Sequence, residues 1–245
     1  MLLSFISSYL NGTSFKVLLA NILLSLPVIL FALSAHEAAH GFVAYKCGDP
    51  TAKNLGRISL NPLRHLDPLG TLCMLLVGYG WAKPVSIDPR YFKNPKRGMA
   101  LSAAAGPLTN LLLGLINAVL AGLFLCFEAI NSYTDSPLFV SYLLNGATLL
   151  FALGTVYNFI FAIFNLIPLP PFDGSRILYA VLPTKWYFAV MKYERTIMIV
   201  VLFLFLALSR FNWSPISLLA RYLTNTLIPA FGELFWALFS PLFFA

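Results

Sequence analysis

Three long stretches without a single charged residue constrain the fold of this chain more than any other feature. They comprise residues 17–35, 98–127 and 139–167, and the first continues as apolar sequence to Tyr45. A helix needs about 20 apolar residues to cross the hydrocarbon core of a bilayer, which is about 30 Å thick. Charged residues make up only 10% of the chain, whereas soluble domains carry about 25%. We therefore predict a membrane protein.

Further apolar segments extend this prediction along the chain. Residues 196–208 are shorter, but flanking Tyr193 and Phe211 can extend them to a fourth span, and residues 214–245 are a weaker candidate for a fifth. Residues 69–81 are too short to cross a bilayer, and with the residues up to 85 they predict a re-entrant, interfacial or β-like segment. The prediction is an all-α polytopic membrane protein with about five (four to six) transmembrane helices. It forms one domain over 1–245, with a site-forming core over about 17–182 and C-terminal spans at 191–245 of unassigned role.

The distribution of charge predicts the orientation of these spans. Of the 16 Lys and Arg residues, thirteen lie in the segments 46–97 and 168–195, whereas the segment 128–138 has two acidic residues and no basic one. Lys and Arg collect in cytoplasmic loops, so we expect both basic loops in the cytoplasm, the N-terminus outside, and the chain in the plasma membrane. The net charge of +7 is then a consequence of topology, and we expect no nucleic-acid partner.

Two of the three histidines occur together in the sequence His36-Glu37-Ala38-Ala39-His40, at the end of the first apolar stretch. Residues four apart share one face of a helix, so both imidazoles can bind one metal ion. Glu37 lies beside that face, where a carboxylate can accept a proton from water. In a soluble protein this pattern also occurs on solvated helix faces. In an apolar helix each ionisable group costs roughly 2.5–3.5 kcal/mol, which favours the metal-binding interpretation.

A third protein ligand is needed for a zinc site that keeps an open position. Asp173 is the candidate, because it lies at the end of the third apolar stretch, on the same side of the membrane as the histidine pair. Three nearby prolines break the helix there. The alternative is that Asp173 simply caps a helix or forms a turn with Gly174.

Other polar residues admit structural explanations. Asn165 can either satisfy backbone groups near Pro168 or serve the site, and Asn158 fits an interhelical hydrogen bond. We expect His65 to form a loop hydrogen bond, with a second metal site or a substrate contact as the alternative. Small or polar residues recur every four positions in the second span and predict close helix packing, with Asn110 offering a polar contact toward the site. These are Ser102, Gly106, Asn110, Gly114, Ala118 and Gly122.

Six segments together give a family resemblance. They are S-A-H-E-A-A-H-G (34–41), G-D-P-T-A-K (48–53), G-R-I-S-L-N-P-L-R-H-L-D-P-L-G-T (56–71), G-W-A-K-P-V (80–85), A-G-P-L-T-N (105–110) and N-L-I-P-L-P-P-F-D-G (165–174). The sequence resembles the site-2 protease family of intramembrane zinc metalloproteases (peptidase family M50), in its compact bacterial type without a PDZ domain. The resemblance implies one zinc ion bound by His36, His40 and Asp173, with Glu37 as general base. It also implies that Asn165 lies near the zinc, where it positions substrate or stabilises the oxyanion.

The expected function is therefore a zinc metalloendopeptidase that cleaves transmembrane or membrane-associated proteins near the cytoplasmic face of the bilayer. A zinc transporter or other metal-handling membrane protein is one alternative, although it would repeat such ligands on several spans. A non-catalytic binder of membrane helices is the other. The sequence predicts neither a particular substrate nor an oligomeric state.

Overall fold

The computed structural model describes residues 12, 14–77, 82–134, 137–183, 193, 196–201, 203–204 and 215–244. Within these residues the chain is helical, and its only β feature is one isolated antiparallel bridge between Leu66 and Ala82. The helices, with two short 3-10 turns, are α2 (Phe15–Lys46), α3 (Thr51–Asn54), η1 (Pro62–Arg64), α4 (Pro68–Val77), η2 (Pro89–Tyr91), α5 (Pro95–Asn131), α6 (Leu138–Asn165), α7 (Asp173–Val181) and α9 (Pro215–Phe244).

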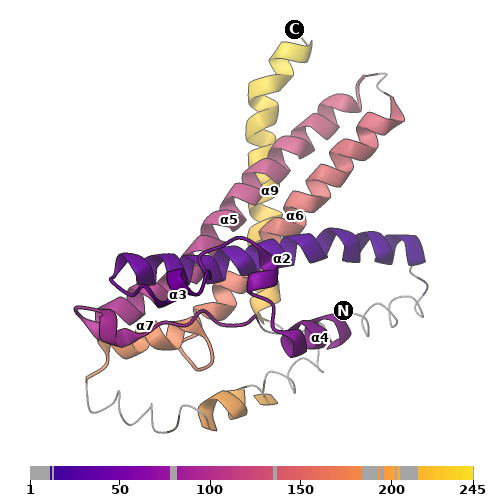
Figure 1. Ribbon diagram of the computed structural model, residues 1–245. Helices are drawn as coiled ribbons and strands as arrows, with labels where there is room; N and C mark the ends of the chain where they lie inside the picture. Colours follow the sequence, from indigo (N-terminus) through magenta and orange to yellow (C-terminus); the bar gives the residue numbers. More distant parts are fainter. Residues whose placement is uncertain are drawn as a thin grey trace.

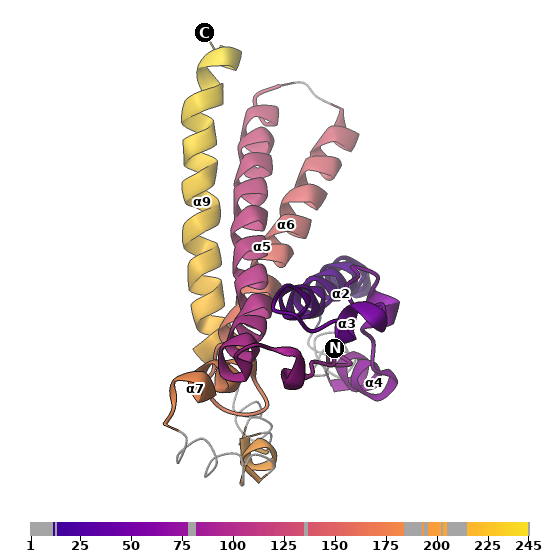
Figure 2. The same ribbon diagram turned by 60° about the vertical axis from the view of Figure 1, so that its left-hand side comes forward.

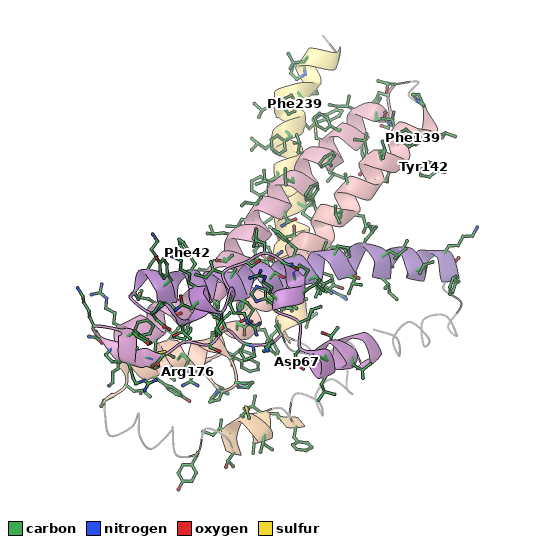
Figure 3. All side chains as sticks on the ribbon, viewed as in Figure 1. Phe42, Asp67, Phe139, Tyr142, Arg176 and Phe239 are labelled. Atoms are coloured by element: carbon green, nitrogen blue, oxygen red, sulfur yellow. The ribbon has the colours of Figure 1, made fainter. Side chains whose placement is uncertain are left out.

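The long helix α5 is the centre of the fold. It packs against α2, α6, α7 and α9, and Figures 1 and 2 both show α5, α6 and α9 running side by side away from the end where α7 lies. Helix α2 runs across the lower part of this group in Figure 1 and is seen nearly end-on in Figure 2, so it lies at a steep angle to α5. Of the side chains labelled in Figure 3, Phe42, Asp67 and Arg176 lie toward the α7 end of the bundle, and Phe139, Tyr142 and Phe239 lie at the other end.

Three helices are long and apolar enough to cross a membrane: Leu19–Lys46 within α2, Pro95–Asn131 (α5) and Leu138–Asn165 (α6). They confirm the first three predicted spans. Their outer faces remain apolar, as a lipid-facing surface requires: Leu112 is 61% exposed and Leu143 56% exposed. The fold class is therefore that of an all-α membrane protein.

The remaining predicted spans have different outcomes. Within the stretch 214–245 the structure describes one helix, α9 (Pro215–Phe244), which is not among the three spanning helices above, so a span there stays a prediction. In the predicted fourth span at 196–208, residues 202 and 205–208 lie outside the described residues, so a total of about five spans stays a prediction. The segment predicted near 69–85 begins as helix α4, residues 78–81 lie outside the described residues, and its β character consists of the Leu66–Ala82 bridge.

The stripe of small residues on α5 packs against its neighbours, as predicted. All six of its members are buried. A methyl group added at Gly114 would lie 2.8 Å from the ring of Phe159 on α6, and one at Gly122 would lie 2.9 Å from the backbone nitrogen of Gly232 on α9. The missing side chains therefore allow α5 to approach both helices closely.

Residues 82–92, which we call the strap, run along the end of α2 and include the short 3-10 turn η2. Its backbone is fixed at three points: the Lys83 N–H donates to the His65 carbonyl at 2.7 Å, the Val85 N–H to Glu37 Oε2 at 3.1 Å, and the Asp88 N–H to Asp49 Oδ2 at 2.7 Å. Asp49 is fully buried, so its carboxylate depends on such donors. The strap is thus attached to the helix that carries the histidine pair.

Candidate metal centre

The two histidines of α2 lie on one face of the helix, as their spacing predicts. Both are buried, at 5% exposure for His36 and 7% for His40. Their rings meet edge to face with centroids 4.6 Å apart, and their Nε2 atoms lie 3.0 Å from each other. One nitrogen of each imidazole therefore points to the same spot.

Asp173 joins this pair from a distant part of the chain. Helix α6 ends at Asn165, a proline-rich loop turns the chain, and Asp173 is the first residue of α7. Its Oδ2 lies 3.1 Å from His36 Nε2 and 3.2 Å from His40 Nε2. Burial raises the pKa of this carboxyl, but the adjacent side chains of His36 and His40 lower it more, so the pKa lies below its usual range. The ionised form that this shift favours is the form in which a carboxylate binds a metal.

The three converging atoms fit a zinc ion. Donor atoms about 2.0–2.2 Å from a tetrahedral zinc lie roughly 3.3–3.6 Å from one another, and the three pairs here are separated by 3.0–3.2 Å. Two imidazole nitrogens and one carboxylate oxygen are also a donor set that zinc prefers in catalytic sites. His36, His40 and Asp173 are also the one group of three or more His, Cys, Asp or Glu side chains among the described residues whose ligand atoms lie close enough together to hold a metal ion.

Glu37 lies next to the pair in sequence but faces the strap. Its side chain is half-buried, and its Oε2 accepts the hydrogen bond from the Val85 N–H. One carboxylate oxygen is thereby oriented by backbone, while Oε1 has no such bond among those observed. The sequence placed 80–85 near the membrane interface but gave no signal for this contact, because it joins residues 48 positions apart.

Helix α5 supplies an acceptor to the other nitrogen of each imidazole. His40 Nδ1 lies 2.7 Å from the Ser102 carbonyl oxygen, and His36 Nδ1 lies 2.5 Å from Asn110 Oδ1. Between them, Gly106 faces both rings: an added methyl group would lie 2.5 Å from His40 Nε2. The expected polar contact of Asn110 toward the site is confirmed. The contact of Ser102 was missed, because a backbone carbonyl carries no sequence signal.

The other polar candidates have structural contacts. The Asn165 amide donates to the Phe161 carbonyl of its own helix at 3.0 Å, and none of its observed hydrogen bonds reaches the His–His–Asp group. Asn158 accepts an interhelical hydrogen bond from Asn110, as expected. His65 is buried, and its Nε2 lies 2.7 Å from the Ser59 carbonyl, which confirms the predicted loop hydrogen bond.

Comparisons with known proteins agree with this chemistry. The chain matches peptidase family M50 over residues 24–208, so it belongs to that family. It is 38% identical over 157 residues to "Putative zinc metalloprotease YwhC" of Bacillus subtilis, which covers 63% of this chain and 67% of that protein. It is 30% identical over 179 residues to "Zinc metalloprotease MJ0392" of Methanocaldococcus jannaschii; the matched region covers 73% of this chain and 38% of that protein. No solved structure gives a significant match.

The family and the site together define the class of enzyme. The chain is a zinc metalloprotease, and its His–His–Asp group lies within the matched residues. Its long apolar helices make it a membrane protein.

Proposed function

We propose that this protein is an intramembrane metalloendopeptidase that cleaves transmembrane or membrane-associated proteins near the cytoplasmic face of the plasma membrane. The observation that carries the proposal is the convergence of His36, His40 and Asp173 at the end of helices that are long enough to span a bilayer. In this proposal the three side chains hold one zinc ion. The N-terminus lies outside, and the basic loops 46–97 and 168–195 lie in the cytoplasm.

Zinc in such a site polarises the scissile carbonyl and lowers the pKa of a water molecule. Glu37 accepts the proton of the attacking water and then delivers it to the leaving amine. Two observations support this role. The hydrogen bond from the Val85 N–H fixes the orientation of the Glu37 carboxylate, and the side chain is only half-buried, so it is not sealed off from its surroundings.

Asn165 is proposed to position the substrate or to stabilise the oxyanion. Its amide nitrogen uses one hydrogen on the Phe161 carbonyl, so a second hydrogen stays available to donate. Its place at the end of α6, just before the loop that leads to Asp173, supports this role.

A helical substrate must change its conformation before cleavage. The carbonyls of a transmembrane helix accept i to i−4 hydrogen bonds, so attack requires local unwinding. We therefore expect preference for substrate helices that contain weak or broken segments. Water reaches the site from the side of the basic loops.

Substitution of Glu37 tests the proposal. The purified protein and Glu37→Gln are incubated with a panel of single-span substrates, with and without a chelator, and bound zinc is measured for both. We expect chelator-sensitive cleavage by the wild type, loss of cleavage in Glu37→Gln, and equal zinc content. Retained cleavage in Glu37→Gln would reject the assigned base. Zinc binding without chelator-sensitive cleavage across the panel would favour a metal-handling protein.

A further inference from the structure

The buried side chain of Asn110 lies against the His36 imidazole, on the side that faces away from the His–His–Asp group. His36 Nδ1 lies 2.5 Å from Asn110 Oδ1, and Asn110 is fully buried within α5. A neutral imidazole carries its proton on one nitrogen only, and a metal binds the other. The identity of the Asn110 atom that faces His36 therefore determines which nitrogen is available to the metal.

Two contacts of Asn110 fix the orientation of its amide. Asn110 Nδ2 donates to the Ala32 backbone carbonyl at 3.2 Å and to Asn158 Oδ1 at 2.9 Å. A backbone carbonyl is only an acceptor, so the nitrogen of Asn110 must face Ala32. Its oxygen then faces His36.

The orientation of Asn158 is fixed in the same manner. Asn158 Nδ2 donates to the Gly154 backbone carbonyl at 2.8 Å, which leaves its Oδ1 as the acceptor for Asn110. Asn158 is 2% exposed, so water does not compete readily for these bonds. The hydrogen bonds therefore run in one direction, from His36 to Asn110 to Asn158 to Gly154, across α2, α5 and α6.

Resting on the proposed role of His36 as a zinc ligand, we propose that Asn110 is a positioning residue that holds the Nδ1 proton of His36. It thereby keeps Nε2 unprotonated and aimed at Asp173 and His40, and Asn158 holds Asn110 in the required orientation. Hydrogen-bond partners of this kind orient metal ligands, and their loss commonly weakens metal binding 10- to 100-fold.

His40 provides an internal contrast. Its Nδ1 faces the backbone carbonyl of Ser102, which no side-chain substitution removes. Only His36 depends on a side chain for this contact, so substitutions at Asn110 should act through one ligand of the three.

Zinc affinity of purified full-length variants, measured by competition with a chelator, tests the proposal together with the thermal stability of the zinc-free proteins. We expect Asn110→Leu to weaken zinc binding roughly 10- to 100-fold. Asn110→Asp keeps an oxygen that can accept the hydrogen bond from the His36 Nδ1–H, so we expect a smaller loss of zinc affinity than in Asn110→Leu. Its thermal stability should nevertheless fall further than that of Asn110→Leu, because a buried carboxylate would face two acceptors, the Ala32 carbonyl and Asn158 Oδ1. Asn158→Leu should give an intermediate loss.

Asn145→Leu is the control. Asn145 is exposed on α6, and its amide donates to the Ser141 carbonyl of its own helix, so zinc affinity should not change. A purely structural role of Asn110 predicts the reverse order, with Asn110→Asp binding zinc no better than Asn110→Leu, and that result would overturn the proposal. Unchanged affinity in Asn110→Leu would overturn it as well.

Nuclear magnetic resonance of ¹⁵N-histidine-labelled, zinc-free protein gives a readout that packing alone would not move. We expect the wild-type His36 to carry its proton on Nδ1 and Asn110→Leu to lose that preference. His36→Ala distinguishes a failure of the proposed metal site from a failure of the positioning role of Asn110. If it leaves zinc affinity unchanged, the proposed metal site is wrong. If it weakens binding while Asn110→Leu does not, only the positioning role is wrong.

Discussion

Substitution of Gly106 by alanine should weaken zinc binding through a clash that the structure locates closely. The added methyl group would lie 2.5 Å from His40 Nε2 and 2.6 Å from His36 Cε1. Ordinary contacts between such atoms lie at about 3.5–4.0 Å, so the rings or α5 must move by roughly 1 Å. Bound zinc would hold the rings more firmly than their hydrogen bonds to α5 alone, so the clash should cost more in the zinc-bound protein. Overpacking costs about 1–3 kcal/mol, which corresponds to roughly 5- to 150-fold weaker zinc binding.

The assay is chelator competition on purified Gly106→Ala, combined with cleavage of a single-span substrate. Gly146→Ala on α6 is the control, because a methyl group there meets no atom within 4 Å. Alanine is favoured over glycine inside a helix by about 0.5–1 kcal/mol, so the control should be neutral or stabilising. Wild-type zinc affinity and activity in Gly106→Ala would refute the reasoning, since they would mean that α5 does not confine the two rings.

Two further substitutions probe the surroundings of the site. Asp49→Ala removes the acceptor of the Thr51 and Asp88 N–H groups and should destabilise the protein by at least about 1–3 kcal/mol, measured by thermal unfolding in detergent; unchanged stability would mean that the strap is held elsewhere. Asn165→Leu should lower kcat 100- to 1000-fold if its amide stabilises the oxyanion, with zinc affinity unchanged; a wild-type kcat would reject that role.

Much of the fold was predictable from the sequence, because a bilayer imposes simple requirements on length and polarity. Every backbone group must be satisfied inside the segment that crosses lipid, so charge-free stretches of sufficient length become helices. The helices α2, α5 and α6 follow the predicted stretches within a few residues at most ends. The steep crossing of α2 and the path of the strap were not predictable, since both depend on contacts between residues far apart in the chain.

The His–His–Asp group was predictable for a different reason. An ionisable side chain is rare in an apolar helix, so His36 and His40 were conspicuous, and topology placed Asp173 on their side. The hydrogen-bond partners of Glu37 and His40 were not predictable from the sequence, because the Val85 N–H and the Ser102 carbonyl belong to the backbone. Any residue type at these positions offers the same groups, and only the path of the chain determines which ones meet the site.

Helix packing and metal binding depend on the same residues of α5. The four-residue spacing that lets α5 approach its neighbours also places the Ser102 carbonyl, the Gly106 backbone and the Asn110 amide along the face that meets α2. Position 106 must be small because two imidazoles fill the space beside it, and position 110 combines burial with a fixed polar contact. A substitution that repacks α2 against α5 therefore changes the surroundings of both histidines at once. Further along the stripe, at Gly122, the neighbour is α9, so a substitution there should change helix packing without changing zinc affinity.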